Sequence, residues 1–222
     1  MTELSVVRGI YFDLWNTLVF TDLVPNPIVA LAEAFGLHGH AGWRKTIEHA
    51  IMTHRLSGIT QALDALQAAT GRETVPGWSR RDLVLLCGEA SRRTTLFADA
   101  LPALRSLSGP GSRLPRMKLG ILSNTQSFDL DFLRRDGLEA AVDSICLSCD
   151  SGLLKPDPAI YHLAAERLSL PPEQILMIGD QWQDDVIGAR DAGFQALLLD
   201  RSGSRTGALT SLTRLAALLS AS

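Results

Sequence analysis

The residue best placed for chemistry is Asp13, which ends the apolar run Ile10-Tyr11-Phe12. A buried strand that carries a carboxylate at its carboxyl end is where open α/β sheets build their active sites. Such a carboxylate can attack phosphorus to form an aspartyl phosphate, or carbon to form an ester. An aspartate after a strand can also form a turn, so the interpretation of Asp13 depends on the segments that follow it.

Two later segments supply groups that would assist a carboxylate nucleophile. Ser123 and Asn124 follow the apolar run 119–122. A hydroxyl there can donate to a phosphoryl or carboxylate oxygen, and a helix N-cap is the alternative explanation. Lys155 is followed by a proline that restricts the backbone. Its ammonium group would keep Asp13 ionised and offset negative charge in the transition state, although a lone loop lysine is commonly solvated surface.

A group of acidic residues follows another apolar run, 175–179. Asp180 comes directly after this run, and Asp184 and Asp185 lie shortly beyond it. Asp13, Asp180 and a backbone carbonyl would provide the hard oxygen ligands that Mg²⁺ prefers. The alternative is that Asp180 caps a helix whose first turn is stabilised by the other two aspartates through the helix dipole.

The order of these groups along nearly the whole chain resembles that of the haloacid dehalogenase (HAD) superfamily. The resemblance implies a Rossmann-like core and a nucleophilic Asp13. Matching Gly188-Ala189 to the family's Gly-Ala pair favours Asp185 over Asp184 as the motif residue. The implied site residues are Asp13, Lys155 and Ser123 for catalysis; Ser123, Asn124, Trp15 and Lys155 for substrate binding; and Asp13, Asp180, Asp185 and the Trp15 carbonyl for Mg²⁺.

Trp15 departs from the family pattern. The first motif usually reads DxDxT, and this chain has Asp13-Leu14-Trp15-Asn16-Thr17. In HAD phosphatases the second aspartate protonates the leaving group and then activates water, which tryptophan cannot do. General acid–base help is worth about 10²–10⁴ in rate. Haloacid dehalogenases carry an aromatic tyrosine here, which favours dehalogenation. They also carry serine at the position of Asp180 and asparagine at that of Trp182, which argues against it.

Three functions therefore remain open. The first is a Mg²⁺-dependent phosphatase that acts on a small phosphorylated metabolite through an aspartyl phosphate. Without the usual general acid, it should prefer good leaving groups such as aryl or acyl phosphates. The second is a 2-haloacid dehalogenase that uses Asp13 as its nucleophile and needs no metal. The third is a catalytically weak relative that binds a phosphometabolite or a partner protein.

The elements that position these residues alternate between strand and helix. This alternation predicts an α/β fold with a doubly wound parallel sheet. Apolar runs predict strands at 6–12, 117–122, 145–147, 175–178 and 196–199. Amphipathic patterns predict helices at 128–136, 158–168, 184–192 and 209–219.

The stretch 22–93 interrupts this alternation with helical patterns at 27–35, 43–55, 59–69 and 80–93. It predicts a small all-helical cap domain, 21–94, inserted into a core of 1–20 and 95–222. Because the insertion follows the first strand, it would close over Asp13 as a lid and exclude water. Four cap arginines, Arg44, Arg55, Arg92 and Arg93, are candidates for reading an anionic substrate, or solvated surface. The glycine- and proline-rich stretch 106–116 predicts a flexible connection.

Composition restricts the partners. Apolar residues make up 46% of the 222 residues and the net charge is −3, without a basic block. We therefore expect a small anionic substrate and no nucleic-acid partner. Residues 1–4 do not resemble a signal peptide, and no run approaches the length of a membrane span. We expect a cytoplasmic monomer or homodimer. The three cysteines predict neither a disulfide framework nor a zinc site.

Overall fold

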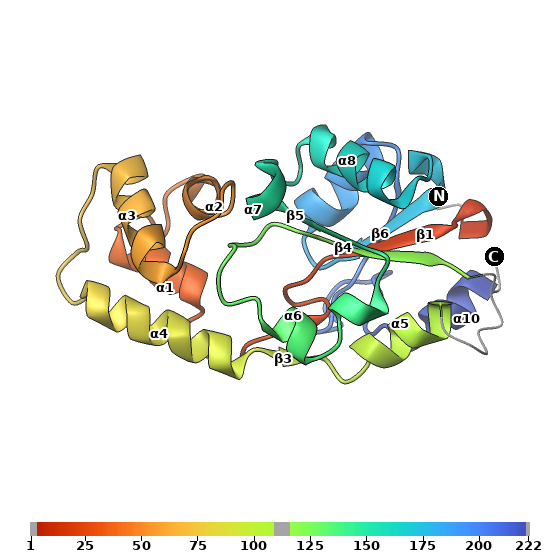
Figure 1. Cartoon of the computed structure of the whole chain (residues 1–222), viewed down its shortest axis with the longest axis horizontal. Helices are drawn as coiled ribbons and strands as arrows, with labels where there is room; N and C mark the ends of the chain where they lie inside the picture. Colours follow the sequence, from red (N-terminus) through yellow and green to blue (C-terminus); the bar gives the residue numbers. More distant parts are fainter. Residues whose placement is uncertain (1–3, 109–115, 221–222) are drawn as a thin grey trace.

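A five-stranded parallel sheet forms the centre of the computed structural model, which describes residues 4–108 and 116–220 (Figure 1). The strand order is β5-β4-β1-β6-β7. The strands are β1 (Gly9–Phe12), β4 (Lys118–Ser123), β5 (Ser144–Leu147), β6 (Ile175–Gly179) and β7 (Gln195–Leu198). The predicted α/β class and doubly wound, Rossmann-like sheet are therefore confirmed. All four residues of β1 are buried, as expected for the central strand of a sheet that is covered on both faces.

Helices cover both faces of the sheet. Ile10 and Phe12 of β1 pack on one face with α5 (Ala100–Ser108) and α10 (Leu215–Ser220). Tyr11 points to the other face, where α8 (Pro158–Leu168) and α9 (Gly188–Asp191) pack. This alternation follows from the two-residue repeat of a strand. The remaining short elements are η1 (Leu4–Val6), α6 (Phe132–Arg135), η2 (Glu139–Ala141), α7 (Ser148–Ser151), η3 (Pro172–Gln174) and η4 (Trp182–Ile187).

Three predicted helices of the core differ from those observed, and the helix expected at 43–55 ends at residue 51. In place of the helix expected at 128–136, the structure has the short helix α6. The longer helix does not form because Asp129 adopts a φ of 59°, which a right-handed helix cannot contain. The helix expected at 184–192 is divided into η4, which is π-helical, and α9. The helix expected at 209–219 is reduced to α10, because Leu209 instead forms a bridge with Leu199. Helix α5 was not predicted.

Helices α1 (Pro27–Ala34), α2 (Trp43–Ile51), α3 (Ile59–Thr70) and α4 (Arg80–Arg93) form a separate group, the cap segment, at the left in Figure 1. Their apolar side chains make a hydrophobic cluster distinct from those of the sheet, and Leu154 of the core joins it. Two short antiparallel strands, β2 (Val19–Phe20) and β3 (Thr95–Leu96), connect the cap segment to the sheet.

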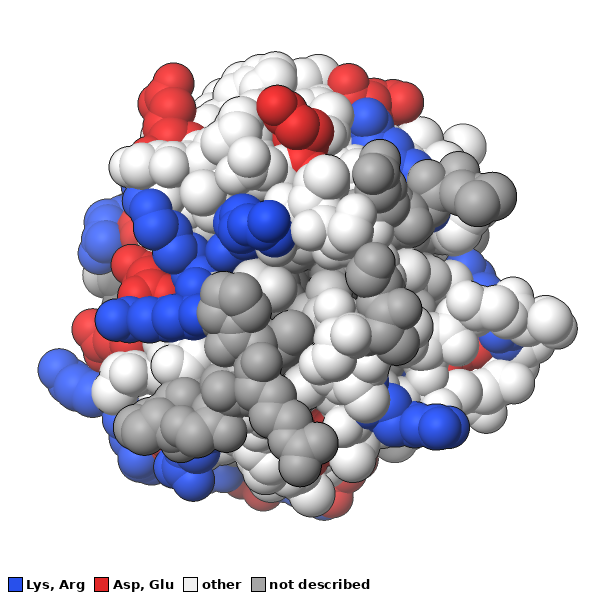
Figure 2. All heavy atoms as spheres, turned by 90° about the vertical axis from the view of Figure 1, so that its right-hand side faces the viewer, with Lys and Arg blue, Asp and Glu red and all other residues white. Residues whose placement is uncertain are grey.

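The first residues of the connection expected at 106–116 end α5, and 109–115 lie outside the described residues. Figure 2 shows the end of the molecule opposite the cap segment, where side chains of both charges lie close together along one edge. Cys87, Cys146 and Cys149 are free thiols. None of the helices in the described part of the chain combines the length and apolar character needed to cross a bilayer.

Candidate active site

The carboxyl ends of β1, β4 and β6 bring together residues that are far apart in the sequence. Phe12 is in register with Ile121 of β4 and with Ile178 of β6. Asp13 and Asp180 therefore leave neighbouring strands at the same edge of the sheet. The backbone N–H of Asp13 donates to the carbonyl of Ile178, at 2.8 Å, which holds the nucleophile candidate in line with the sheet.

Lys155 lies between two carboxylates at this edge. Its Nζ is 2.8 Å from Asp13 Oδ1 and 2.5 Å from Asp185 Oδ1, and its side chain is only 3% exposed. Burial alone would lower the pKa of the Lys155 ammonium, but the charges of Asp13 and Asp185 outweigh it and raise that pKa. Lys155 therefore remains a cation and fixes the orientation of both carboxylates.

Asn124 holds the backbone of Lys155 at both its polar groups. The Asn124 Oδ1 accepts from the Lys155 N–H at 2.8 Å, and the Asn124 Nδ2 donates to the Lys155 carbonyl at 3.0 Å. Asn124 was predicted to bind substrate. It does line the cavity at this edge, but the contacts it makes within the chain are those that position the lysine.

Asp13, Asp180 and Asp185 form an acidic cluster, with one oxygen from each lying within 4.8 Å of the others. Asp185 is fully buried and accepts from Lys155 with Oδ1 and from the Gln181 N–H with Oδ2. Asp180 Oδ2 accepts from the Gln181 side chain at 2.6 Å. A side chain at residue 179 would overlap Asp185, so Gly179 is what allows Asp185 to approach.

The charge balance of this cluster suits a divalent cation. Burial and the charge of Asp13 raise the pKa of Asp180 to about 6. Burial, which outweighs the attraction of Lys155, raises the pKa of Asp185 to about 7. Three carboxylates thus face one ammonium, in surroundings that penalise their negative charge. Carboxylate oxygens are the ligands of Mg²⁺, so these residues fit the predicted metal. Asp13 and Asp180 line the cavity and Asp185 does not.

The structure places Trp15 and Ser123 differently with respect to the cavity. Trp15 lines it. Its indole N–H donates to Thr125 Oγ1 at 3.0 Å, and its ring packs edge-on against Phe132. Ser123 is fully buried and is not among the lining residues. Within the described part of the chain, its hydroxyl makes one long contact, 3.5 Å, with the carbonyl of Asn124. The predicted contact between Ser123 and substrate stays a prediction.

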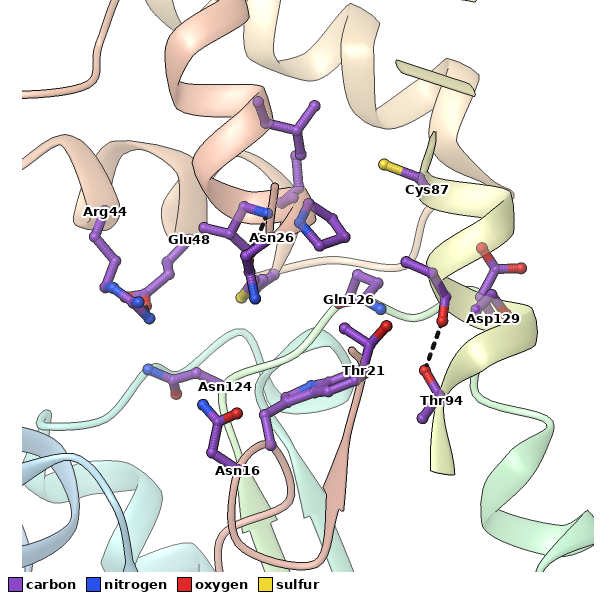
Figure 3. Close-up of a pocket in the computed structure, with 18 of the residues that line it drawn as sticks. Asn16, Thr21, Asn26, Arg44, Glu48, Cys87, Thr94, Asn124, Gln126 and Asp129 are labelled. Atoms are coloured by element: carbon purple, nitrogen blue, oxygen red, sulfur yellow. Dashed lines mark hydrogen bonds and ion pairs between the residues drawn. The ribbon is translucent and has the colours of Figure 1, made fainter. Parts of the chain in front are cut away.

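A cavity of about 170 Å³ lies over Asp13, between the sheet edge and the cap segment (Figure 3). Its wall combines apolar cap residues, including Ile28, Leu31, Ile51 and Met52, with polar groups from the core. Of the four arginines considered from the sequence, only Arg44 lines it. The other three form ion pairs elsewhere, Arg55 with Asp150, Arg92 with Glu89 and Arg93 with Asp22.

Glu48 is a cavity residue that the sequence analysis missed. It belongs to α2, and only 7% of it is exposed. Its position in the helix gives a signal that was available, because Glu48 follows Arg44 by four residues and precedes Ile51 by three. Residues at these spacings share one helix face. A glutamate that shares a helix face with isoleucine indicates that this face packs against other residues or borders a cavity and does not face solvent.

Comparisons with known proteins agree with this arrangement. The family model described as haloacid dehalogenase-like hydrolase matches residues 7–193. A glyceraldehyde 3-phosphate phosphatase from Methanothermobacter thermautotrophicus is 31% identical over 207 residues, 88% of this chain and 86% of that protein. An (S)-2-haloacid dehalogenase from Pseudomonas sp. strain YL is 29% identical over 210 residues, 90% of this chain and 86% of that protein. The crystal structure of a HAD phosphatase from Thermococcus onnurineus superposes with a TM-score of 0.62 at 20% identity, covering 96% of this chain and 98% of that one.

Proposed function

Because this chain belongs to the haloacid dehalogenase-like hydrolase family, we propose that it is a Mg²⁺-dependent phosphatase acting on a small phosphorylated metabolite through an aspartyl-phosphate intermediate. The observation that carries the proposal is the acidic cluster of Asp13, Asp180 and Asp185. A nucleophile that attacks carbon without a metal has no need of two further carboxylates, one half-buried and one fully buried, within 4.8 Å of it. The 31% identity to a glyceraldehyde 3-phosphate phosphatase also supports this proposal.

The proposed roles follow from the contacts within the chain. Asp13 attacks phosphorus, and Lys155, bound to Asp13 at 2.8 Å, offsets negative charge on the phosphoryl group. Asp185 holds Lys155 from its other side. Asp13, Asp180 and the Trp15 carbonyl would hold Mg²⁺, with Asp185 beside them. When bound there, the cation would neutralise charge on the phosphoryl oxygens.

The experiment that tests the proposal is hydrolysis of p-nitrophenyl phosphate with Mg²⁺ and, separately, with excess chelator. We expect turnover that requires Mg²⁺ and is abolished by Asp13→Asn. Asp191→Asn makes the same chemical change at an exposed position and serves as the control. Equal turnover with Mg²⁺ and with chelator, or turnover by Asp13→Asn equal to that of the parent protein, would contradict the proposal.

A second candidate, a 2-haloacid dehalogenase, is favoured by one observation. Trp15 presents no group able to protonate a leaving alkoxide, and halide departs without a proton. The 29% identity to an (S)-2-haloacid dehalogenase supports the same candidate. Halide release from 2-chloropropionate in excess chelator is its test. Binding of phosphorylated compounds without turnover of either substrate would favour the third candidate, a relative that binds and does not catalyse.

A further inference from the structure

A phosphatase reaction at Asp13 needs a proton at the leaving oxygen, and the first motif does not supply one. The attacking and leaving oxygens lie roughly in line across the phosphorus. Asp13 attacks from the sheet edge, so the leaving oxygen lies on the opposite side, toward the cap segment. The proton donor is therefore to be sought among the residues that the cap segment contributes to the cavity. This inference rests on the proposed phosphatase function.

Few titratable side chains in the cavity wall fit that place. Asp13, Lys155 and Asp180 belong to the cluster that holds the phosphoryl end. Asp184 also lines the cavity, but it lies on η4 of the core and not on the cap segment. Cys87 comes from the cap segment, but burial raises the pKa of its thiol to about 12, so it is a poor acid. Asp129 lies beside Cys87 and Thr94, at the end of the cavity away from Asn124 (Figure 3).

Glu48 has the required position. Figure 3 shows Arg44 and Glu48 extending from the cap segment toward Asn124, the residue that holds Lys155. Among the described residues, the Glu48 carboxyl has one ionic contact, with Arg44 at 3.8 Å, and no hydrogen bond. It is a buried carboxyl that lines the cavity with its hydrogen-bonding capacity unused.

We propose that Glu48 is the general acid–base residue of this site and performs the proton transfers that Trp15 cannot. In the first step, Asp13 forms a bond to phosphorus as the bond from phosphorus to the leaving oxygen breaks. The Glu48 carboxyl gives its proton to that oxygen, and a neutral alcohol or phenol leaves. In the second step, water attacks the aspartyl phosphate and gives a proton to the Glu48 carboxylate. Phosphate departs, and Asp13 and protonated Glu48 are restored.

The charges around Glu48 suit this role. Burial raises the pKa of the Glu48 carboxyl to about 7, and the negative charge of Asp184, on η4, adds to the rise. Three cations oppose it, Arg44 and Lys45 from α2 itself and Lys155 from the core. A general acid–base group works best when its pKa lies near the working pH. Both forms of Glu48 are then populated near neutrality.

The test compares two substrates that differ in how much they need the proton. Phenyl phosphate has a poor leaving group and p-nitrophenyl phosphate a good one. With Mg²⁺ present, Glu48→Gln should lower kcat/KM for phenyl phosphate by about 10² and for p-nitrophenyl phosphate only a few-fold. Glu73→Gln, the same change at an exposed cap position, should alter neither. Equal losses on both substrates, or no loss on either, would overturn the inference.

A second measurement uses the unmodified protein. Because the acid must be protonated, kcat/KM for phenyl phosphate should fall as the pH rises through about 7, and that for p-nitrophenyl phosphate should fall less. Parallel profiles would overturn the role of Glu48 while leaving the phosphatase function in place. If the unmodified protein hydrolyses neither substrate with Mg²⁺, the phosphatase proposal fails, and the inference fails with it.

Discussion

The indole N–H of Trp15 donates to the hydroxyl of Thr125, 3.0 Å away, and this contact occupies the only donor of the side chain. Thr125 is fully buried, and its own N–H donates to Ser148. Trp15 is thus bound to the core beneath the cavity and presents only its ring to whatever the cavity holds. The side chain at residue 15 therefore contributes to packing, but it cannot perform the proton transfer that the second aspartate performs in HAD phosphatases.

Restoring a carboxyl at residue 15 should improve the reaction of poor leaving groups. We expect Trp15→Asp, introduced into the Glu48→Gln protein, to raise kcat/KM for phenyl phosphate about tenfold or more, with little gain for p-nitrophenyl phosphate. The loss of the ring contact with Phe132 should lower the free energy of unfolding by about 2 kcal/mol. Trp15→Tyr keeps an aromatic ring without the carboxyl and should show no gain on phenyl phosphate. A gain with tyrosine would refute the explanation.

Removing the cation between Asp13 and Asp185 should destabilise the protein. Lys155→Met leaves two buried carboxylates without their partner, and we expect a loss of about 3 kcal/mol in the free energy of unfolding at pH 8. The loss should be smaller at pH 5, because Asp185, whose pKa is raised to about 7, is then protonated. Urea unfolding at the two pH values measures it. Arg55→Met removes an exposed cation paired with Asp150 and should change little.

Glu48 should reduce stability at high pH. Its pKa is raised to about 7 from an ordinary value of 4.5, so the folded protein favours the protonated form. The resulting destabilisation is absent below pH 4.5, grows as the pH rises toward 7, and is complete above it. Glu48→Gln should therefore stabilise the protein at pH 8 by about 3 kcal/mol at most. Urea unfolding at pH 8 and pH 4.5 measures this, and an equal gain at both would contradict the cause given.

Gly179 should tolerate no side chain. A Cβ there overlaps the carboxylate of Asp185, so Gly179→Ala must displace Asp185 from Lys155. We expect a loss of about 2 kcal/mol in stability and the loss of most turnover of p-nitrophenyl phosphate. Gly58 has an extended backbone, φ 163°, and open space around its Cβ position. Gly58→Ala should leave both quantities unchanged, and similar effects of the two substitutions would contradict the steric cause.

The sequence could predict the parts of the site that depend on the sheet alone. Asp13 and Asp180 follow continuous apolar runs, and the carboxyl ends of parallel strands share one edge. Their proximity could therefore be predicted without side-chain detail. The positions of the strands along the chain and the extent of α8 depend on equally strong patterns. These predictions agree with the structure for the same reason. A regular element that is buried along its length leaves a continuous apolar pattern in the sequence.

The remaining parts depend on contacts between elements. Helical spacing marks the face of α2 that carries Glu48, but what this face meets depends on how the cap segment lies over the sheet edge, which local periodicity does not encode. Asn124 lines the cavity, and its predicted contact with substrate stays a prediction; its amide also holds the backbone of Lys155, a contact across 31 residues that the sequence does not reveal. The left-handed backbone of Asp129 shortens a helix that its neighbours favour. In each case, contacts between elements that are distant in the sequence decide the structure, and such contacts can override local preferences.

Leu154 and Lys155 are joined by one peptide bond but belong to different packed bodies. Leu154 is part of the hydrophobic cluster of the cap segment, whereas Lys155 binds the two aspartates of the sheet edge. Separating the cap segment from the sheet would expose Leu154 to water, at a cost of about 2 kcal/mol. The same peptide carries Lys155, so a change in the packing of Leu154 would be transmitted to the ammonium group beside Asp13.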